Sequence, residues 1–392
     1  MSTAKTIIYH HRTRGVGAEG VHIRSIVSAL RNMNFNVNIV SFPGTDPDES
    51  RSNKTTKKRK SIKSIILEKS ASTLPQIVFE LLEILYNIVT IIRLRPLIKN
   101  NIYFIYERYS LFLFITVWLC RQKQIPIILE VNDSALVERV RPLLLKKIAK
   151  RIEKWIFTNA TGLVFISTKF KDLVQDEYHS IAPYVITPNG ADITFFNPEK
   201  YDREKVRSTL SLTNKVVCGY VGAFVYWHGI HWFVDLIKNK IKNYPDLALL
   251  LVGDGKMFDQ VQQMILDNNL EKQVIMTGRV SHDKVPELIS AMDFAILPDS
   301  NIYGSPMKMF ELMAMGVAVI SPDYPPISEV IEDKANGWLF TSGDHEECIN
   351  YTLEIASDEN KVYKDIGKDA RQFIIENRQW KHNAEKILGL LN

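Results

Sequence analysis

The stretch NIYGSPMKMFELMAMGVAVIS (residues 301–321) decides the fold. The apolar run Phe294–Leu297 before it reads as a short buried strand that ends at Pro298, and the residues after Gly316 read as another. Between them, Ser305 is predicted as the N-cap of a helix and Pro306 as its first residue. Gly316 stands where helices commonly end. Strand, loop, helix and strand in this order are typical of a parallel sheet.

The start of this predicted helix is a candidate anion site. In open parallel sheets, ligands bind beyond the carboxyl ends of the strands, where free N–H groups and the helix dipole favour phosphate. Lys308 adds a full positive charge, and Glu311, three residues later, shares its side of the helix. An acid one turn behind a phosphate can accept hydrogen bonds from two sugar hydroxyls, as in a nucleotide ribose. The alternative interpretation is an ordinary surface Lys/Glu pair.

The composition indicates a globular chain of two α/β domains. The chain has 392 residues, 46% of them hydrophobic and 24% charged. Cys120, Cys218 and Cys348 show no metal-binding or redox spacing, which predicts a reducing, cytoplasmic setting. The N-terminus runs directly into a strand-like segment, so no signal peptide is expected.

The net charge of +5 is concentrated locally. The segment 54–63 (KTTKKRKSIK) holds six basic residues, and the apolar segment 74–99 follows it. In that segment Glu80, Glu83, Asn87 and Thr90 recur at helical spacing as one polar stripe. The apolar part is too short and too interrupted to span a bilayer. Two interpretations stay open: a buried helix preceded by a solvated loop, or an anchor on an anionic membrane surface. Interleaved aromatic residues are missing from the basic tract, so nucleic acid is not an expected partner.

Apolar runs alternate with helical patterns throughout both halves of the chain. This predicts two doubly wound, Rossmann-like parallel-sheet domains that meet near the loop 188–202. Helical patterns include 20–33 and 143–158. The predicted strands are 6–10, 36–42, 102–107, 125–131, 162–167, 184–187, 216–222, 247–253, 273–278, 294–298, 317–321 and 337–340.

A glycine-containing loop, 15–20, follows the first strand and lets backbone approach a ligand closely. It lacks the dehydrogenase GxGxxG spacing. No acidic residue ends the second strand to hold a ribose, and Asp46 comes only beyond a loop. A dinucleotide site is therefore weakly indicated.

Several segments, in this order, resemble glycosyltransferase family four, retaining enzymes with the GT-B fold. They are GVGAEGVHIRSIVSAL, IYERYS, GLVFIST, VITPNGADITFFNP, YVGAFVYWHGI, LLLVGDG, VIMTGRV and GSPMKMFELMAMGVAVIS, and they span nearly the whole chain. The resemblance implies an acceptor-binding domain at 1–195, joined by a crossover helix at 378–392. It implies a donor-binding domain for the nucleotide sugar at 196–377.

Carried onto this chain, the resemblance places the ribose hydroxyls on Glu311 and the diphosphate near the amides of 305–307 and Lys308. The segment 278–280 would line the base pocket, and Gly17 would back the diphosphate from the other domain. The implied donor-binding residues are Gly17, Gly222, Arg279, Val280, Tyr303, Gly304, Ser305, Pro306, Met307, Lys308 and Glu311.

The chain departs from the family pattern at several places. Tyr303 stands where the family's first motif glutamate contacts the donor sugar. Ala223 and His228 occupy places that often hold Arg and Lys. Positive charge must then come from Lys308, Arg279 and a protonated His228. Asn132, followed by Asp133, stands in place of a common histidine.

The resemblance implies a retaining, metal-independent hexosyltransferase without a cofactor. Its donor would be a nucleoside diphosphate sugar, with UDP favoured over GDP, and its acceptor a glycan or lipid-linked glycan of bacterial polysaccharide or glycoconjugate biosynthesis. Glu311, Lys308, His228 and Asn132 are the expected catalytic residues. Further candidates for sugar or acceptor contacts are His10, His11, Glu130 and Asp133. Alternatives are a sugar-nucleotide epimerase, a NAD-dependent two-domain dehydrogenase and a non-catalytic scaffold at a membrane surface.

Overall fold

The computed structural model describes residues 5–13, 15, 17–41, 75–99, 101–138 and 142–391. The basic tract predicted at 54–63 lies outside these residues. Contacts divide the chain into an N-terminal unit, Met1–Thr187 with Asn383–Asn392, and a C-terminal unit, Pro188–His382. The sequence placed this division at 195/196, and the division in the structure falls at the start of the same loop, 188–202.

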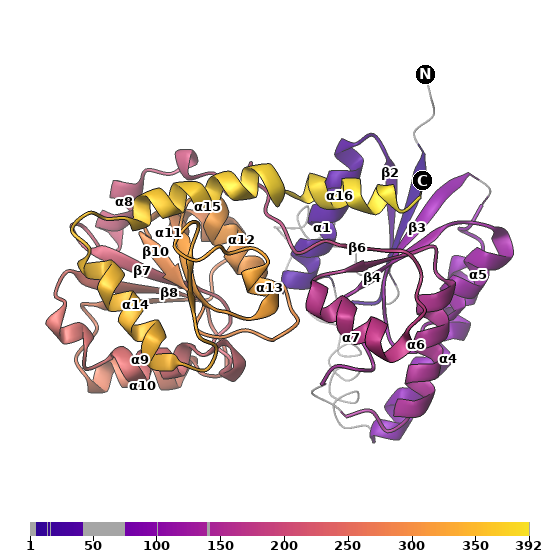
Figure 1. Cartoon of the computed structure of the whole chain (residues 1–392), viewed down its shortest axis with the longest axis horizontal. Coiled ribbons are helices and arrows are strands. Elements are labelled where there is room, and N and C mark those ends of the chain that lie inside the picture. Colours follow the sequence, from indigo (N-terminus) through magenta and orange to yellow (C-terminus); the bar gives the residue numbers. More distant parts are fainter. Residues whose placement is uncertain are drawn as a thin grey trace, which may run out of the picture. The chain divides into compact units, whose positions relative to one another are not determined.

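The N-terminal unit is built on a parallel sheet with the order β2-β1-β3-β4-β5-β6 (Figure 1). Because parallel crossovers are right-handed, α1 covers one face and α4, α5, α6 and α7 cover the other. The strands are β1 (Thr6–His11), β2 (Asn36–Ser41), β3 (Ile102–Arg108), β4 (Ile127–Val131), β5 (Gly162–Phe165) and β6 (Tyr184–Ile186). The helices are α1 (Gly17–Asn32), α4 (Gln76–Leu94), α5 (Ile115–Lys123), α6 (Lys146–Asn159) and α7 (Thr168–Tyr178).

The C-terminal unit repeats the architecture with the strand order β12-β11-β10-β7-β8-β9. Its strands are β7 (Val216–Val221), β8 (Leu247–Val252), β9 (Val274–Gly278), β10 (Phe294–Ile296), β11 (Ala318–Pro322) and β12 (Trp338–Phe340). Its α-helices are α8 (Arg203–Thr209), α9 (Ile230–Ile237), α10 (Phe258–Asp267), α11 (Val285–Ser290), α12 (Met307–Ala314), α13 (Pro325–Ser328), α14 (His345–Ser357) and α15 (Tyr363–Asn377). Short 3-10 turns lie at Pro198–Lys200, Tyr226–His228, Ile241–Asn243 and His282–Lys284.

Both sheets are buried on both faces, which explains why their strands read as unbroken apolar runs. All six residues of β8 are buried, and alternate ones pack into separate cores on the two faces of the sheet. Each apolar run predicted as a strand forms one, and the predicted architecture of two doubly wound parallel-sheet domains is confirmed.

The segment between β10 and β11 forms the predicted helix, but its start differs from the prediction. Helix α12 begins at Met307 with Pro306 as its N-cap, and no side chain caps it. The Ser305 hydroxyl instead accepts a hydrogen bond from the Asn189 backbone N–H at 2.9 Å. The prediction of Ser305 as N-cap and Pro306 as first helical residue was therefore wrong by one position. Gly316 ends the helix with a φ of 75°, as predicted.

The helix α4 turns its polar stripe inward. Glu80, Asn87 and Thr90 are buried, whereas Leu81, Leu82, Leu85 and Ile88, which lie between them, are exposed. Asn87 accepts hydrogen bonds from the backbone N–H groups of Phe114 and Ile115 at 3.1 and 3.0 Å, and so satisfies the start of α5. The interpretation of α4 as a buried helix was therefore wrong.

The two connections between the units lie side by side within the C-terminal unit. The Ala191 N–H donates to the Arg378 carbonyl at 3.0 Å, and Ala191 forms an isolated parallel bridge with Gln379. A Cβ on Gly190 would come within 2.6 Å of the same carbonyl, so the two segments are in direct backbone contact. From this contact α16 (Trp380–Gly389) continues the chain into residues 383–392 of the N-terminal unit.

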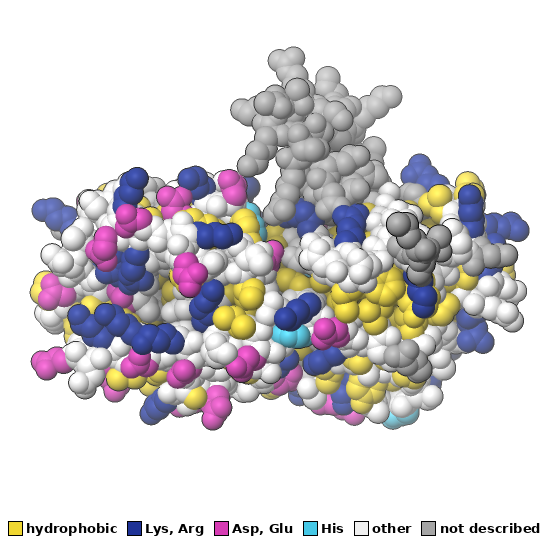
Figure 2. All heavy atoms as spheres, turned by 90° about the horizontal axis from the view of Figure 1, so that it is seen from above, with side chains coloured by type: hydrophobic (Ala, Val, Ile, Leu, Met, Phe, Trp, Pro, Cys, Tyr) yellow, Lys and Arg dark blue, Asp and Glu magenta, His cyan; other side chains and the backbone are white. Residues whose placement is uncertain are grey.

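On the face in Figure 2, Lys and Arg side chains of the C-terminal unit alternate with Asp and Glu. No helix among the described residues is long and apolar enough to cross a membrane.

The orientation of α4 makes a stability prediction. Replacing Asn87 with Ala leaves buried N–H groups at the start of α5 unpaired, so we expect the free energy of unfolding to fall by about 2–4 kcal/mol. Ile88→Ala is the matched control because Ile88 is 56% exposed, and a change within about 0.5 kcal/mol is expected. Urea unfolding followed by tryptophan fluorescence compares the two, and equal losses would contradict the inward orientation of Asn87.

Candidate functional site

The candidate site of the C-terminal unit lies where the strand order of its sheet reverses. From β7 the chain moves outward through β8 and β9, then returns to β10 on the other side of β7. Such a switch point is where open parallel sheets bind ligands. Gly222 follows β7 and Lys308 follows β10, and a Cβ on Gly222 would lie only 3.0 Å from Lys308 Nζ. The fold thus brings these two predicted residues together.

The Lys308 ammonium group is buried, and Nζ has no hydrogen-bond partner among the described residues. It lies 5.0 Å from the centre of the Tyr220 ring, a weak cation–π contact. Burial lowers the pKa of Lys308 to about 7, although Asp299 acts in the opposite direction. A buried cation without a partner is costly, and an anion bound beside Gly222 would satisfy it.

His228 stands next to this lysine but carries no charge at neutral pH. Burial and then the neighbouring Lys308 lower the pKa of His228 to about 4. Its Nδ1 donates to the Ala223 carbonyl at 2.9 Å, so in the neutral ring Nε2 is an acceptor. The prediction that a protonated His228 supplies positive charge is therefore wrong near pH 7.

Glu311 is buried on α12, and its side chain contacts other residues than the side chain of Lys308 does. Its Oε1 lies 3.3 Å from His282 Nε2, and the His282 ring stacks on Phe195 with centroids 5.2 Å apart. Lys308 meets Gly222 instead, so the two side chains do not form a surface ion pair. The carboxylate of Glu311 is held in place by an aromatic-backed histidine, as a fixed acceptor of hydrogen bonds.

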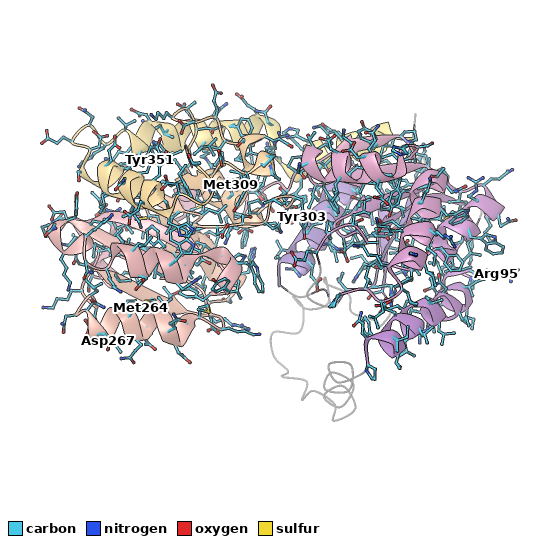
Figure 3. The ribbon with its side chains drawn as sticks, turned by 60° about the horizontal axis from the view of Figure 1, so that its bottom comes forward. Arg95, Met264, Asp267, Tyr303, Met309 and Tyr351 are labelled. Carbon is cyan, nitrogen blue, oxygen red and sulfur yellow. The ribbon has the colours of Figure 1, made fainter. Side chains whose placement is uncertain are left out.

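The loop before α12 is ordered by its own polar groups. Asn301 Oδ1 accepts hydrogen bonds from the backbone N–H groups of Tyr303 and Gly304. Asn189 holds both the hydroxyl and the carbonyl of Ser305. Tyr303 lies in this loop, and Met309 lies on α12 and is fully buried (Figure 3). The amides of Met307 and Lys308 follow Pro306 at the helix start, where the dipole favours an anion.

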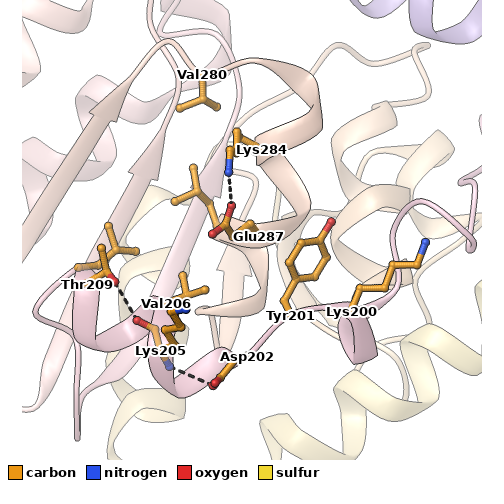
Figure 4. A pocket seen from close by; sticks show the side chains of 11 residues that line it. Lys200, Tyr201, Asp202, Lys205, Val206, Thr209, Val280, Lys284 and Glu287 are labelled. Carbon is orange, nitrogen blue, oxygen red and sulfur yellow. Dashed lines mark hydrogen bonds and ion pairs between the residues drawn. The ribbon is translucent and has the colours of Figure 1, made fainter.

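Arg279 and Val280 are placed away from these contacts. Arg279 is 82% exposed, and its Nε lies 3.5 Å from an Asp254 carboxylate oxygen. Val280 lines a cavity of about 490 Å³ together with Tyr201 and an ion pair of Lys284 and Glu287 (Figure 4). No contact among the described residues joins either side chain to Lys308.

The N-terminal unit gathers a second polar cluster around Glu130, at the end of β4. Glu130 accepts from Arg108 at 2.5 Å, His22 at 3.1 Å and the Tyr9 hydroxyl at 3.2 Å, and also from Asn132. Burial would raise the pKa of Glu130, but His22 and then Arg108 outweigh it and hold that pKa at about 2. The carboxylate stays ionised and fixes the orientation of Asn132.

The ends of β1 and β3 add a buried pair, His10 Nδ1 and Glu107 Oε2, 2.5 Å apart. Burial, followed by His10, lowers the pKa of His11 to about 4, so His11 is neutral near pH 7. Asp133 Oδ1 accepts from the Ser134 N–H at 2.8 Å. Gly17 begins α1 with a φ of 65° and open space around its Cβ position. These residues surround the switch point of this sheet, between β1 and β3.

Several participants were missed from the sequence. His282, Arg108, His22 and Glu107 each contact a predicted residue or lie beside one. His282 follows the quoted GRV segment closely, and Glu107 and Arg108 stand inside the IYERYS segment. The position of Glu107 and Arg108 at the end of β3 was the available signal for these two, whereas His22 lies within α1 and His282 opens a 3-10 turn. Among the described residues, no group of three His, Cys, Asp or Glu side chains is placed to hold a metal ion.

Two family models match the chain, one in each half. Residues 19–195 match the model described as Glycosyltransferase Family 4, and residues 202–389 match that of Glycosyl transferases group 1. An uncharacterized glycosyltransferase of Methanocaldococcus jannaschii is 26% identical over 245 residues, 60% of this chain and 59% of the relative. N-acetyl-alpha-D-glucosaminyl L-malate synthase of Bacillus anthracis is 30% identical over 151 residues, 38% of this chain and 37% of the relative.

The fold has solved counterparts. The Anabaena protein HepE, solved in complex with UDP, superimposes with a TM-score of 0.68 at 16% identity, over 98% of this chain and 99% of that one. Two parallel-sheet units of this kind, each with a ligand-binding switch point, define the GT-B class. The chain belongs to glycosyltransferase family 4. Its matches to the first curated relatives span about half of their length, from 42% to 59%.

The buried lysine predicts a pH-dependent anion affinity. A bound diphosphate raises the pKa of Lys308 above its value of about 7. Above pH 7, binding of a diphosphate therefore requires the neutral Lys308 amine to take up a proton. Below pH 7 the lysine is already charged. Above it, the affinity for pyrophosphate should fall by up to about tenfold per pH unit. Isothermal titration across this range measures the slope.

Lys308→Arg is the control for this prediction, because arginine keeps its charge over the whole range. Its pH profile reports the ionisation of pyrophosphate alone. The role of Lys308 would be contradicted if wild type and Lys308→Arg lost affinity in parallel.

Proposed function

We propose that the protein is a retaining glycosyltransferase that moves a hexose from a nucleoside diphosphate sugar to a glycan or lipid-linked acceptor. The single observation that carries the proposal is the buried Lys308 ammonium beside Gly222, which lacks a hydrogen-bond partner among the described residues. At the start of α12 it adds a charge to free amide groups, and a diphosphate complements both.

Glu311 is proposed to accept hydrogen bonds from the two ribose hydroxyls of the donor. It follows Lys308 by one turn on α12, so a ribose can reach it from a diphosphate at the helix start. The contact with His282 at 3.3 Å orients one carboxylate oxygen. Membership in family 4 supports this assignment.

The proposed chemistry depends on stabilising the leaving group. Breaking the bond between the anomeric carbon and the phosphate oxygen builds negative charge on the diphosphate and positive charge on the sugar ring. Preorganised donors that face the diphosphate lower this barrier most. Lys308 and the amides of Met307 and Lys308 are proposed to supply them, without a metal or another cofactor. The acceptor hydroxyl would attack the anomeric carbon on the face that the phosphate leaves and give its proton to that phosphate, so the anomeric configuration is retained.

The N-terminal unit is proposed to bind the acceptor. Its polar cluster offers Asn132 and Asp133 at the end of β4, with Asn132 oriented by the ionised Glu130. His11 is neutral near pH 7, so its ring can donate a hydrogen bond to a sugar hydroxyl there or accept one from it.

UDP is the proposed nucleotide because HepE, which shares the fold, was solved with UDP. Bacterial polysaccharide or glycoconjugate biosynthesis is the proposed setting. A thermal-shift panel of UDP, GDP, ADP and NAD, each with and without magnesium, tests the donor class, since selective binding raises apparent stability. Stabilisation by one nucleoside diphosphate without magnesium supports the proposal, and stabilisation by NAD alone would overturn it.

Release of nucleotide distinguishes a transferase from an epimerase of the same fold. A transferase should release UDP from a UDP-sugar rapidly only when an acceptor glycan is added. Proton NMR of the product should show the anomeric configuration of the donor. Inverted configuration would remove the retaining assignment, and product formed from the donor alone would favour an epimerase.

Glu311→Ala should lower kcat/KM at least about a hundredfold, since hydrogen bonds to a charged acceptor worth roughly 3 kcal/mol are lost. Glu354→Ala, an exposed acid on α14, is the matched control and should leave activity unchanged. Steady-state kinetics with the nucleotide sugar makes the comparison. Near-normal turnover in Glu311→Ala would refute the ribose assignment.

Lys308→Ala should weaken UDP binding at least about tenfold and leave uridine binding within about twofold, because only UDP carries the diphosphate. Isothermal titration of both ligands against the wild type measures the two ratios. Equal weakening of UDP and uridine would mean that Lys308 supports the pocket as a whole.

A further inference from the structure

The helices α4, α5 and α6 carry an unusually apolar outer surface, which we call the α4–α6 face. On α4 the exposed large hydrophobic side chains are Ile77, Val78, Leu81, Leu82, Leu85, Ile88, Val89 and Ile92. Surface helices of globular proteins normally turn such residues toward the core. A monomer in water gains nothing from this arrangement, and exposed apolar patches of this size mark interaction surfaces.

Directed hydrogen bonds fix α4 in this orientation. Glu80 accepts from the backbone N–H groups of Leu144 and Leu145, at 2.8 and 2.7 Å, just before α6 begins. Asn87 serves the start of α5 in the same way and also donates to the Phe112 carbonyl at 2.8 Å. If the apolar side of α4 turned inward, Glu80 and Asn87 would move into water. The backbone groups that they bond would then be left buried without a partner. The outward leucines are therefore part of the folded state.

Two tryptophans extend the apolar surface beyond α4. Trp118 on α5 and Trp155 on α6 are both exposed, and they line a groove of about 350 Å³ with Phe114, Ile152 and Arg151. Contacts join α4 to α5 and α5 to α6 along the same side of the sheet. Tryptophan is enriched where apolar and polar phases meet, because its ring is apolar and its N–H is polar.

The exposed charged side chains on these three helices are all basic. They are Arg93, Arg121, Lys123, Lys146, Lys147, Arg151 and Lys154. The acids point inward: Glu153 accepts hydrogen bonds from Tyr109, Ser134 and Tyr178, at 2.6, 2.6 and 2.7 Å. Glu83 pairs with Arg12 at 2.9 Å. The surface thus combines apolar side chains with a single sign of charge.

We propose that the α4–α6 face docks on an anionic membrane surface. The leucines and isoleucines of α4 would enter the boundary between headgroups and acyl chains, the tryptophans would lie at headgroup level, and the basic side chains would pair with lipid phosphates. A second copy of the chain is a poorer occupant, because a symmetric contact through this face would bring the α6 cations together. The inference concerns the location of the protein and does not depend on the donor chemistry.

Vesicle co-sedimentation of the full chain tests this proposal. The vesicles contain phosphatidylcholine alone or an equal mixture of phosphatidylcholine and phosphatidylglycerol. We expect binding to the anionic vesicles that weakens with added salt. Leu85→Ser/Ile88→Ser should lower the partition coefficient about tenfold or more, and Lys146→Gln/Lys147→Gln/Lys154→Gln should remove the preference for anionic lipid.

Leu266→Ser/Val362→Ser is the matched control, because both residues are exposed hydrophobics of the C-terminal unit. It should bind vesicles like the wild type. The proposal is overturned if the wild type does not sediment with anionic vesicles, or if the two serine double variants bind equally. It is also overturned if Leu85→Ser/Ile88→Ser only abolishes self-association in analytical ultracentrifugation, which would identify a second copy as the occupant.

Quenching by brominated lipids locates the contact. Trp118 and Trp155 should be quenched by brominated anionic vesicles, and Trp118→Phe/Trp155→Phe should lose most of that quenching. Quenching that persists in this variant would place the contact elsewhere. UDP binding by Leu85→Ser/Ile88→Ser should equal that of the wild type, so failure of the membrane proposal and failure of the transferase proposal give different results.

Discussion

A parallel sheet brings the carboxyl ends of all its strands to one edge, and both units of this protein depend on that constraint. In each unit the strand order reverses beside the first strand, so the loops there diverge and leave backbone groups accessible. The residues that carry chemistry lie at these two places. Lys308 and Gly222 meet at one switch point, and His10, Glu107 and Arg108 end the strands at the other.

The two clusters solve the problem of buried charge in opposite ways. Glu130 is surrounded by His22, Arg108, Tyr9 and Asn132, so its charge is satisfied within the protein. Among the described residues, the Lys308 ammonium has no hydrogen-bond partner and contacts an aromatic face, with Asp299 acting from further away. A satisfied ion rigidifies its neighbours, whereas a desolvated one gains most when a ligand supplies the missing charge. This contrast supports donor binding at Lys308 and a fixed acceptor scaffold around Glu130.

The sequence predicted the strands and the order of elements well, because unbroken apolar runs follow directly from burial on both faces. It predicted α12 but not its cap: the Ser305 hydroxyl is taken by Asn189, a partner more than a hundred residues away. It could not foresee that burial and Lys308 would leave His228 uncharged. Helical periodicity revealed the polar stripe of α4 but not its direction, which Glu80 and Asn87 settle through the starts of α6 and α5.

The contact between the two connecting segments has a mechanical consequence. Ala191 is bonded to the Arg378 carbonyl, and Asn189, two residues earlier, holds both the hydroxyl and the carbonyl of Ser305. The passages of chain that leave the C-terminal unit are thus fastened to each other and to the residue that precedes Pro306 and α12. Any tension along this pair of segments is transmitted through three hydrogen bonds to the turn that presents Lys308. A displacement of the two connecting segments would therefore also displace the first turn of α12.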